Sequence, residues 1–365
     1  MIREALYPES LSINSSKSSY EVFFDKDIDL VLEGDVLGLF DENVRRLDDY
    51  KNWNKIEKIS IEVSESTKNL NTCRDIIEQM AQNGVKKTHT LIAIGGGAIQ
   101  DLATLTASLY MRGIYWKFVP TTLMSMMDSC IGGKSSLNSG DFKNIIGNFF
   151  PPSEVIVDPL VLDWDNAIAM SNGIAEGLKI TFAAGEDCFY EFLQAINEWR
   201  VTNDVRYMKR AIFLSLLAKK KFVEVDEFDQ GVRRHLNFGH TYAHALESAT
   251  NFQVPHGIAV LIGMTAAIRR VNSPIPCGLL LEKIQDEMNL SQFARGNVVQ
   301  INHEVLIKAF QRDKKNRNGM QVLILPNELG NLGVYEFSMS RLALEMCTED
   351  LYGALEVLGV SFEIL

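Results

Sequence analysis

The sequence has no long hydrophobic run. Its longest apolar stretch, Ile258 to Ile268, is interrupted by Gly263 and Thr265 and ends at Arg269. That is well short of the about 20 apolar residues that a membrane-spanning helix needs. The N-terminal segment MIREALYPES carries charges where a signal peptide has an apolar core. We therefore expect neither a membrane span nor a secretory leader.

The sequence also has few cysteines and fewer basic than acidic residues. The 5 cysteines are scattered and form no CxxC pair, which argues against a disulfide framework or a cysteine zinc site and favours a reducing, cytoplasmic setting. Lys and Arg number 36 against 47 Asp and Glu, for a net charge of -11. A nucleic acid or an anionic membrane is therefore disfavoured as a partner, because such surfaces need a basic footprint. An anionic small molecule is compatible if cations are concentrated locally.

Two domains are expected, because 365 residues exceed what one compact core usually holds. The first part alternates short apolar runs with helical patterns, over residues 30–40, 59–63, 71–83, 89–94, 98–111 and 114–119. This alternation predicts a Rossmann-like, doubly wound parallel sheet. From about Ala167 onward, long helical patterns dominate, over residues 169–184, 190–199, 208–223, 241–249 and 258–270. We predict an α/β domain over residues 1–155 and a mostly α-helical domain over 156–365, with Pro151-Pro152 near the boundary.

One glycine-rich turn stands out in the first part. The apolar run His89 to Ile94 leads directly into Gly95-Gly96-Gly97, and a helical pattern follows. Glycines let the backbone approach a phosphate closely, and the helix N-terminus offers unpaired N–H groups. The pattern is not G-x-G-x-x-G, so a plain tight turn explains it equally well.

Histidine is rare but clustered, since four of the 6 histidines fall between His235 and His256. His240 and His244 share one face of a helix, and His256 opens the next helical segment after Pro255. Zinc favours nitrogen ligands and needs three or four of them. The clustering favours a metal site over ordinary polar residues at helix starts. The spacing does not show which histidines bind or which carboxylate completes the site; Glu176 is one candidate.

Several cations lie among glycines or apolar residues, where each alone is typical of a snorkelling side chain. Together they can form a pocket for a polyanionic small molecule. They are Arg112, Lys134, Lys143, Lys179, Lys219, Arg233, Lys314 and Lys315.

Four motifs taken together resemble those of the dehydroquinate synthases, a family of sugar-phosphate cyclases. They are the stretch from GGGAIQDL at Gly95 to Pro152, Arg233 with LNFGHTYAHALE, the His256-Gly257 pair, and RDKKNRNGMQVLILP at Arg312 to Pro326. The resemblance covers roughly Asp41 to Pro326. The four motifs together are far more specific than the glycine turn or the histidine cluster alone.

The resemblance assigns roles residue by residue. It implies that Glu176, His240 and His256 bind zinc, with Co²⁺ as another possible metal, and that His244 contacts the substrate phosphate instead. It implies a substrate pocket of Asp128, Lys134, Lys143, Asn144, Lys179, Lys219, Arg233, Asn237 and Lys314. It implies that Arg112 reaches the phosphate site of a neighbouring subunit in a homodimer. The positions that match NAD contacts are Asp41, Asn43, Glu65, Lys68, Gly95, Gly96, Gly97, Asp101, Thr121 and Thr122.

The implied reaction converts 3-deoxy-D-arabino-heptulosonate 7-phosphate to 3-dehydroquinate and phosphate. It runs through transient oxidation by NAD, β-elimination, re-reduction and an aldol closure, with zinc as a Lewis acid. Lys219 and Arg233 match the contacts to the substrate carboxylate. An amino-heptulosonate phosphate, sedoheptulose 7-phosphate, glucose 6-phosphate and a metal-dependent polyol dehydrogenase activity stay open, as does binding without turnover.

The sequence also departs from the family pattern. Gln100 and Thr104 stand where glycines are usual beside the cofactor loop, Ala243 replaces a glycine in the histidine motif, and Ser135-Ser136 replace Thr-Ala. A side chain at Gln100 or Thr104 needs room that glycine does not.

Overall fold

The computed structural model divides the chain into two compact units. It describes residues 6–24, 26–44, 47–64, 66–140, 142–271, 277–295, 297–313, 316, 318–327 and 331–365. The first unit comprises Met1–Asp163 and Gln194–Phe228, and the second comprises Trp164–Leu193 and Asp229–Leu365. The domain boundary at residue 155 stays a prediction. Among the described residues, no helix combines the length and the hydropathy that a membrane crossing requires.

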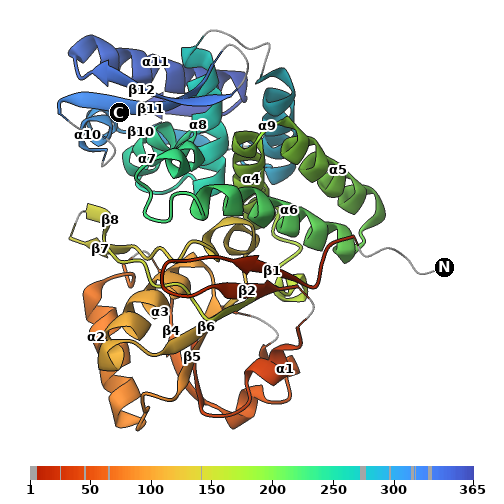
Figure 1. Ribbon diagram of the computed structural model, residues 1–365. Helices are drawn as coiled ribbons and strands as arrows, with labels where there is room; N and C mark the ends of the chain where they lie inside the picture. Colours follow the sequence, from red (N-terminus) through yellow and green to blue (C-terminus); the bar gives the residue numbers. More distant parts are fainter. Residues whose placement is uncertain are drawn as a thin grey trace. The chain divides into compact units, whose positions relative to one another are not determined.

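The first unit is built on a seven-stranded sheet with the order β1-β2-β9-β6-β5-β3-β4 (Figure 1). The strands are β1 (Ser10–Ile13), β2 (Tyr20–Phe23), β3 (Val36–Asp41), β4 (Glu57–Ile61), β5 (Thr90–Gly95), β6 (Tyr115–Pro120) and β9 (Glu154–Ile156). Within the sheet as described, β1 and β2 run antiparallel and each other neighbouring pair is parallel. The predicted parallel-dominated sheet is confirmed.

The strand order reverses beside β3. From β3 the chain moves outward to β4 and then returns to β5 on the other side of β3. Ligands of open α/β sheets bind beyond the carboxyl ends of the strands at such a switch point. β3 ends at Asp41, β5 ends at Gly95, and α3 (Gly97–Leu109) begins directly afterwards. The topology therefore places the glycine turn where a nucleotide is expected.

Helices and one hairpin complete the first unit. They are α1 (Ile28–Val31), α2 (Leu70–Gln82), a π-helical turn η4 (Ser125–Ser129), the hairpin strands β7 (Leu137–Ser139) and β8 (Phe142–Ile146), and α6 (Val205–Val223). α6 packs against η4, where the Ser215 hydroxyl donates to the carbonyl oxygen of Met127 at 2.8 Å.

The second unit is mainly helical, as predicted (Figure 1). Its helices are α4 (Ala167–Ala184), α7 (His240–Ala249), α8 (His256–Arg270), α9 (Gly278–Ser291), α10 (His303–Arg312) and α11 (Arg341–Val357), and α5 (Glu186–Thr202) runs from the second unit into the first. It also holds two strand pairs, β10 (Val298–Ile301) with β13 (Ser361–Ile364), and β11 (Met320–Pro326) with β12 (Leu332–Ser338).

Helix α8 is the core of the second unit. Every residue from Gly257 to Ile268 is buried, so the apolar run of the sequence is an interior helix. Two glycines bring the start of α7 against it. A Cβ at Gly263 would lie 2.2 Å from the carbonyl oxygen of Gly239, and Gly239 has a φ of 77°, which favours glycine. This contact fixes the position of His240, the first residue of α7, relative to α8.

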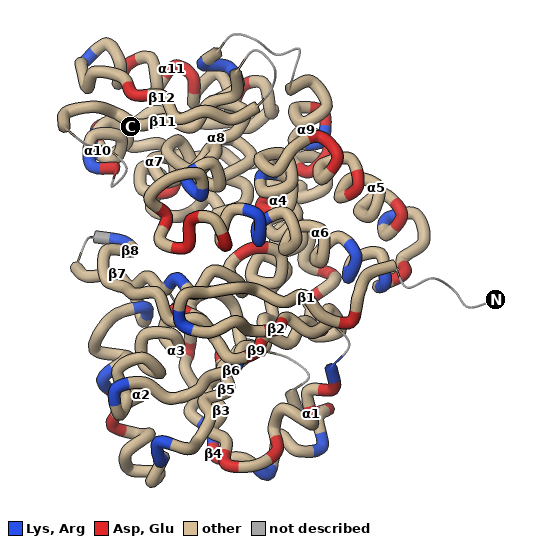
Figure 2. Tube along the Cα trace, in the orientation of Figure 1, with Lys and Arg blue, Asp and Glu red and all other residues tan. Residues whose placement is uncertain are grey.

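The two signs of charge are interspersed along the described trace of both units (Figure 2). Helix α6 is an exception, because its charged side chains are all Lys or Arg, whereas α2, α9, α10 and α11 carry both signs.

Candidate active site

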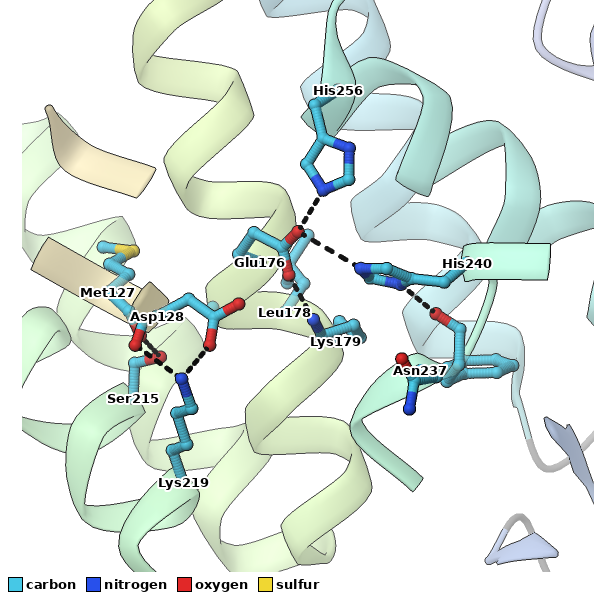
Figure 3. Close-up of polar contacts among 12 residues, drawn as sticks. Met127, Asp128, Glu176, Leu178, Lys179, Ser215, Lys219, Asn237, His240 and His256 are labelled. Carbon is cyan, nitrogen blue, oxygen red and sulfur yellow. Dashed lines mark hydrogen bonds and ion pairs between the residues drawn. The ribbon is translucent and has the colours of Figure 1, made fainter. Parts of the chain in front are cut away.

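Three predicted metal ligands meet in the second unit. Glu176 lies in the middle of α4 and is 1% exposed. Its Oε1 is 3.1 Å from Nε2 of His256 and 3.7 Å from Nε2 of His240. One ligand atom from each residue lies within 4.8 Å of the other two. Figure 3 shows both rings turned toward the same carboxylate.

In both histidines, the ring nitrogen that faces away from Glu176, Nδ1, has a hydrogen-bond partner of its own. Nδ1 of His240 is 3.3 Å from the carbonyl oxygen of Phe238, and Nδ1 of His256 is 3.1 Å from Oε1 of Glu247. A carbonyl and a carboxylate only accept hydrogen bonds, so each Nδ1 carries the hydrogen. In the neutral ring, the lone pair is then on Nε2, which faces Glu176. Two imidazole nitrogens and a carboxylate oxygen are donors that zinc prefers, so these residues fit the metal.

The second oxygen of Glu176 forms an ion pair with Lys179, one turn later on α4. Burial alone would raise the pKa of Glu176, but Lys179 and His256 lower it to about 2, so the group is an anion. Burial would lower the pKa of His256, but its hydrogen bonds to Glu176 and Glu247 raise it to about 10 in the metal-free protein. A metal ion held at Nε2 would displace that proton.

A close contact between α4 and α8 brings His256 to Glu176. A Cβ at Gly257 would lie 2.3 Å from the Cα of Asn172, so only glycine lets the two backbones approach this closely. The Asn172 side chain also accepts a hydrogen bond from the backbone N–H of Ile258 at 3.2 Å. Asn172 lies one turn before Glu176 on α4, and Gly257 directly follows His256. The His-Gly pair in the sequence therefore has a geometric reason.

His244 lies beside the metal-ligand candidates. Its ring centroid is 5.3 Å from that of His240 and 6.1 Å from that of His256. His244, Glu247 and His256 form a second group of potential ligand atoms within 4.8 Å of one another. The assignment of His244 to the substrate phosphate stays a prediction.

In the first unit, Asp41, the glycine turn Gly95 to Gly97 and Thr121 lie at the carboxyl edge of the sheet, as predicted for NAD contacts. Asp41 ends β3 and accepts hydrogen bonds from the backbone and side-chain amides of Asn43 at 2.9 and 3.0 Å. After β5, Gly96 caps α3 without a side-chain hydrogen bond, and a Cβ there would lie 3.1 Å from the methyl group of Thr122. The backbone N–H of Thr121 donates to the carbonyl oxygen of Gly95 at 2.9 Å. The uncapped helix start suits a phosphate.

A buried ion pair joins the cofactor positions to a predicted substrate residue. Lys68 Nζ is 2.7 Å from Oδ2 of Asp101 and donates to Oδ1 of Asn144 at 2.8 Å. The backbone N–H of Ser136 donates to Asp101 at 2.9 Å. Burial raises the pKa of Asp101, while Lys68 and Ser136 oppose that shift. Asn144 has a φ of 55°, a left-handed conformation that asparagine tolerates.

Asp128 and Lys219 form a second ion pair in the first unit. Oδ1 of Asp128 is 2.6 Å from Lys219 Nζ, which also donates to the carbonyl oxygens of Asp128 and Ile131 at 2.7 and 3.1 Å. Lys219 is 5% exposed, and Figure 3 shows the Lys219 ammonium directed at Asp128.

The other side chains predicted to bind substrate lie in several different elements. Lys134 forms an isolated bridge with Phe149, Lys143 lies on β8, and Arg112 follows α3 with a φ of 64°. Arg233 and Asn237 belong to the short helix η6 (Val232–Asn237) that precedes α7; Arg233 is buried, and Asn237 donates to the carbonyl oxygen of Arg234 at 3.2 Å. Glu65 and Lys314 lie outside the described residues. All binding roles given to these side chains stay predictions.

The structure accommodates the departure at Gln100. Gln100 is 2% exposed; its amide donates to the carbonyl oxygen of Ser129 at 2.6 Å and accepts from the Ser129 hydroxyl at 2.6 Å. The Thr104 hydroxyl donates to the carbonyl oxygen of Gln100 at 2.7 Å. The two Gln100–Ser129 hydrogen bonds tie α3 to η4, which carries Asp128, and the Thr104 bond lies within α3. The pairing of Gln100 with Ser129 was not predicted, because the two positions are far apart in sequence.

Two family models together match most of the chain. Residues 58–170 match the family model described as 3-dehydroquinate synthase N-terminal, and residues 173–316 match 3-dehydroquinate synthase C-terminal. The 3-dehydroquinate synthase of Dictyoglomus thermophilum is 36% identical over 280 residues, covering 76% of this chain and 78% of that protein. The 3-dehydroquinate synthase of Alkaliphilus metalliredigens is 32% identical over 351 residues, covering 89% and 94%.

Two solved structures share the fold. A 2-deoxy-scyllo-inosose synthase complexed with carbaglucose-6-phosphate, NAD⁺ and Co²⁺ superposes with a TM-score of 0.80 at 19% identity, covering 93% of this chain and 99% of that one. A 2-epi-5-epi-valiolone synthase from Streptomyces hygroscopicus with NAD⁺ and Zn²⁺ bound gives a TM-score of 0.77 at 24% identity, covering 94% and 99%. The matched family models and relatives place the chain in the sugar-phosphate cyclase superfamily. Within that superfamily, the chain belongs to the dehydroquinate synthase family.

Proposed function

We propose that this protein is a carbon–oxygen lyase that converts 3-deoxy-D-arabino-heptulosonate 7-phosphate to 3-dehydroquinate and phosphate. The observation that carries the proposal is the Glu176, His240 and His256 cluster, in which both Nε2 atoms face one buried carboxylate. Relatives that match most of the chain are named 3-dehydroquinate synthase. We therefore assign that activity to this chain.

The proposed cofactors are a divalent metal, zinc or cobalt, and NAD. Glu176, His240 and His256 would hold the metal, and the carboxyl edge of the sheet around Asp41 and the glycine turn Gly95 to Gly97 would hold NAD. When bound, the metal supplies Lewis-acid polarisation of a substrate hydroxyl, and NAD supplies a temporary hydride acceptor. The uncapped N-terminus of α3 offers N–H groups to the cofactor's phosphates.

The chain's own residues bind and orient the substrate. Lys179 keeps Glu176 ionised and holds its second oxygen, so the first oxygen stays directed at the histidines. We assign the substrate phosphate to Lys134, Lys143, Asn144 and His244, and the substrate carboxylate to Lys219 and Arg233, because these positions match the family motifs. Ammonium and guanidinium groups form charge-assisted hydrogen bonds to both anions.

The proposed assembly is a cytoplasmic homodimer in which Arg112 reaches the neighbouring phosphate site. Met111 and Arg112 both have positive φ values, of 47° and 64°, and such uncommon conformations concentrate at functional sites. The free cysteines of the described chain suit a reducing compartment.

A phosphate-release screen tests the proposal. Purified enzyme with NAD and zinc is offered the heptulosonate, its amino analogue, sedoheptulose 7-phosphate and glucose 6-phosphate. We expect turnover with the heptulosonate and loss of turnover after chelation of the metal. Release from another phosphate alone would reassign the substrate, and release from none would contradict the activity.

A further inference from the structure

Glu247 occupies a defined place behind the proposed metal site. It lies on α7, seven residues after His240 and three after His244, so all three side chains share one face of the helix. Its carboxylate is 14% exposed, and Oε1 is 3.1 Å from Nδ1 of His256. Glu247 is the last residue of the motif LNFGHTYAHALE, but the family resemblance assigns it no role.

The connection from α7 to α8 returns the chain to Glu247. Asn251 and Phe252 both have positive φ, at 48° and 60°, and the backbone N–H of Phe252 donates to the carbonyl oxygen of Glu247 at 2.8 Å. This tight turn lets His256, nine residues later, face the carboxylate of Glu247. The two side chains are therefore brought together by local backbone geometry.

Two arrangements of a metal compete for His256. In one, Nε2 binds together with Glu176 and His240; in the other, His256 binds with His244 and Glu247. The first is favoured, because Glu176 is 1% exposed and already held by Lys179. In that arrangement Nδ1 of His256 carries a hydrogen and donates it to Glu247, just as Nδ1 of His240 faces the carbonyl oxygen of Phe238.

We propose that Glu247 is a positioning residue for the metal site and not a ligand. It accepts the Nδ1 hydrogen of His256, which fixes the tautomer and the ring orientation and directs the Nε2 lone pair toward Glu176. Outer carboxylates of this kind raise the basicity of the bound imidazole, and their removal typically costs 10–100-fold in metal affinity. The inference rests on the proposed metal site at Glu176, His240 and His256.

The test compares the zinc affinity of five purified proteins by competition with a chromogenic chelator at constant pH. They are the wild type, Glu247→Leu, Glu247→Gln, Glu176→Gln and His244→Ala. We expect Glu247→Leu to bind about 10–100-fold more weakly, while Glu247→Gln stays within severalfold of the wild type, because its amide oxygen still accepts from Nδ1. His244→Ala, the matched change on the same helix face, should leave affinity unchanged, and Glu176→Gln should lose most of it.

The visible spectrum of the Co²⁺-loaded proteins gives a second readout. Both Glu247 variants should keep the band positions of the wild type, because the ligand atoms are unchanged, whereas Glu176→Gln should shift or lose the bands. Equal weakening by His244→Ala and both Glu247 variants would make Glu247 a ligand and overturn the inference. Wild-type affinity in Glu247→Leu would also overturn it. A wild type that binds no zinc would remove the proposed metal site itself, which is a distinguishable failure.

Discussion

Replacing Gly257 by alanine tests the contact that brings His256 to Glu176. The added Cβ would lie 2.3 Å from the Cα of Asn172, 2.6 Å from its carbonyl oxygen and 2.8 Å from its carbonyl carbon. All three atoms are backbone, so no side chain can rotate away. Carbon atoms in contact normally stand about 3.5–4.0 Å apart, so α4 and α8 must separate locally by roughly 1 Å.

That displacement should affect both stability and metal binding. Overpacking of this kind costs about 1–3 kcal/mol in the free energy of unfolding. The same shift separates Nε2 of His256 from Oε1 of Glu176, now 3.1 Å apart, although metal–ligand distances tolerate only about 0.2 Å. We therefore expect zinc affinity to fall by about tenfold or more, a loss as large as that from removing an outer partner of a ligand.

The assays are urea denaturation of the metal-free protein and chelator competition for zinc. Gly278→Ala is the matched control, because Gly278 also lies in the first turn of a helix, α9, and a Cβ there meets nothing within 4 Å. The control should match the wild type in both measurements. If Gly257→Ala is as stable as the control and binds zinc equally well, the close approach of α4 and α8 does not position the site.

Three further predictions concern the first unit and the thiols. Gln100→Ala should lower the free energy of unfolding by about 1–3 kcal/mol, because it leaves Ser129 without its partner; in urea denaturation, exposed Gln79→Ala is the control, and equal effects would contradict the account. Burial would raise the pKa of Glu154, but its two ion pairs, with Lys26 and with Lys117, lower it. These ion pairs therefore stabilise the fold above the pKa of Glu154 in the unfolded chain, and the stabilisation is lost as the pH falls through its pKa in the folded protein. Glu154→Gln should therefore cost up to about 1 kcal/mol at neutral pH and progressively less toward acid pH; a cost that grows on acidification would refute the sign. Finally, a thiol reagent should label Cys188 in the native protein and all 5 cysteines after unfolding, since the others are buried and burial raises the pKa of Cys130 to about 12; rapid native labelling of Cys130 would contradict its burial.

The sequence predicted the parallel sheet well, because alternating strands and helices carry different periods. The run 89–94 is β5 at Thr90–Gly95, and the helix predicted over 98–111 is α3 at Gly97–Leu109. The run 30–40 instead divides into α1 and β3, and Gly34 with a φ of 86° lies between them. The strand pair β11–β12 was not predicted, because a short and largely buried apolar run such as Met320–Pro326 is equally compatible with a helix or a strand.

The site was predicted less completely than the fold. The clustering of histidines predicted a metal site. Whether His256 or His244 faces Glu176, however, depends on the direction that the turn at Asn251 and Phe252 gives to α8. Glu176 comes from a distant helix, and nothing local in the sequence pairs it with His256. Glu247 could have been found from its helical spacing to His240 and His244, which places all three on one face.

The most direct test of the central claim follows phosphate release and NADH absorbance together in one reaction. The enzyme is supplied with zinc, NAD and 3-deoxy-D-arabino-heptulosonate 7-phosphate, and His256→Ala is run in parallel. The account predicts steady phosphate release without net accumulation of NADH in the wild type, because the hydride returns to the substrate in each turnover, and neither signal in the variant. Steady accumulation of NADH without phosphate would identify a dehydrogenase instead and contradict the account.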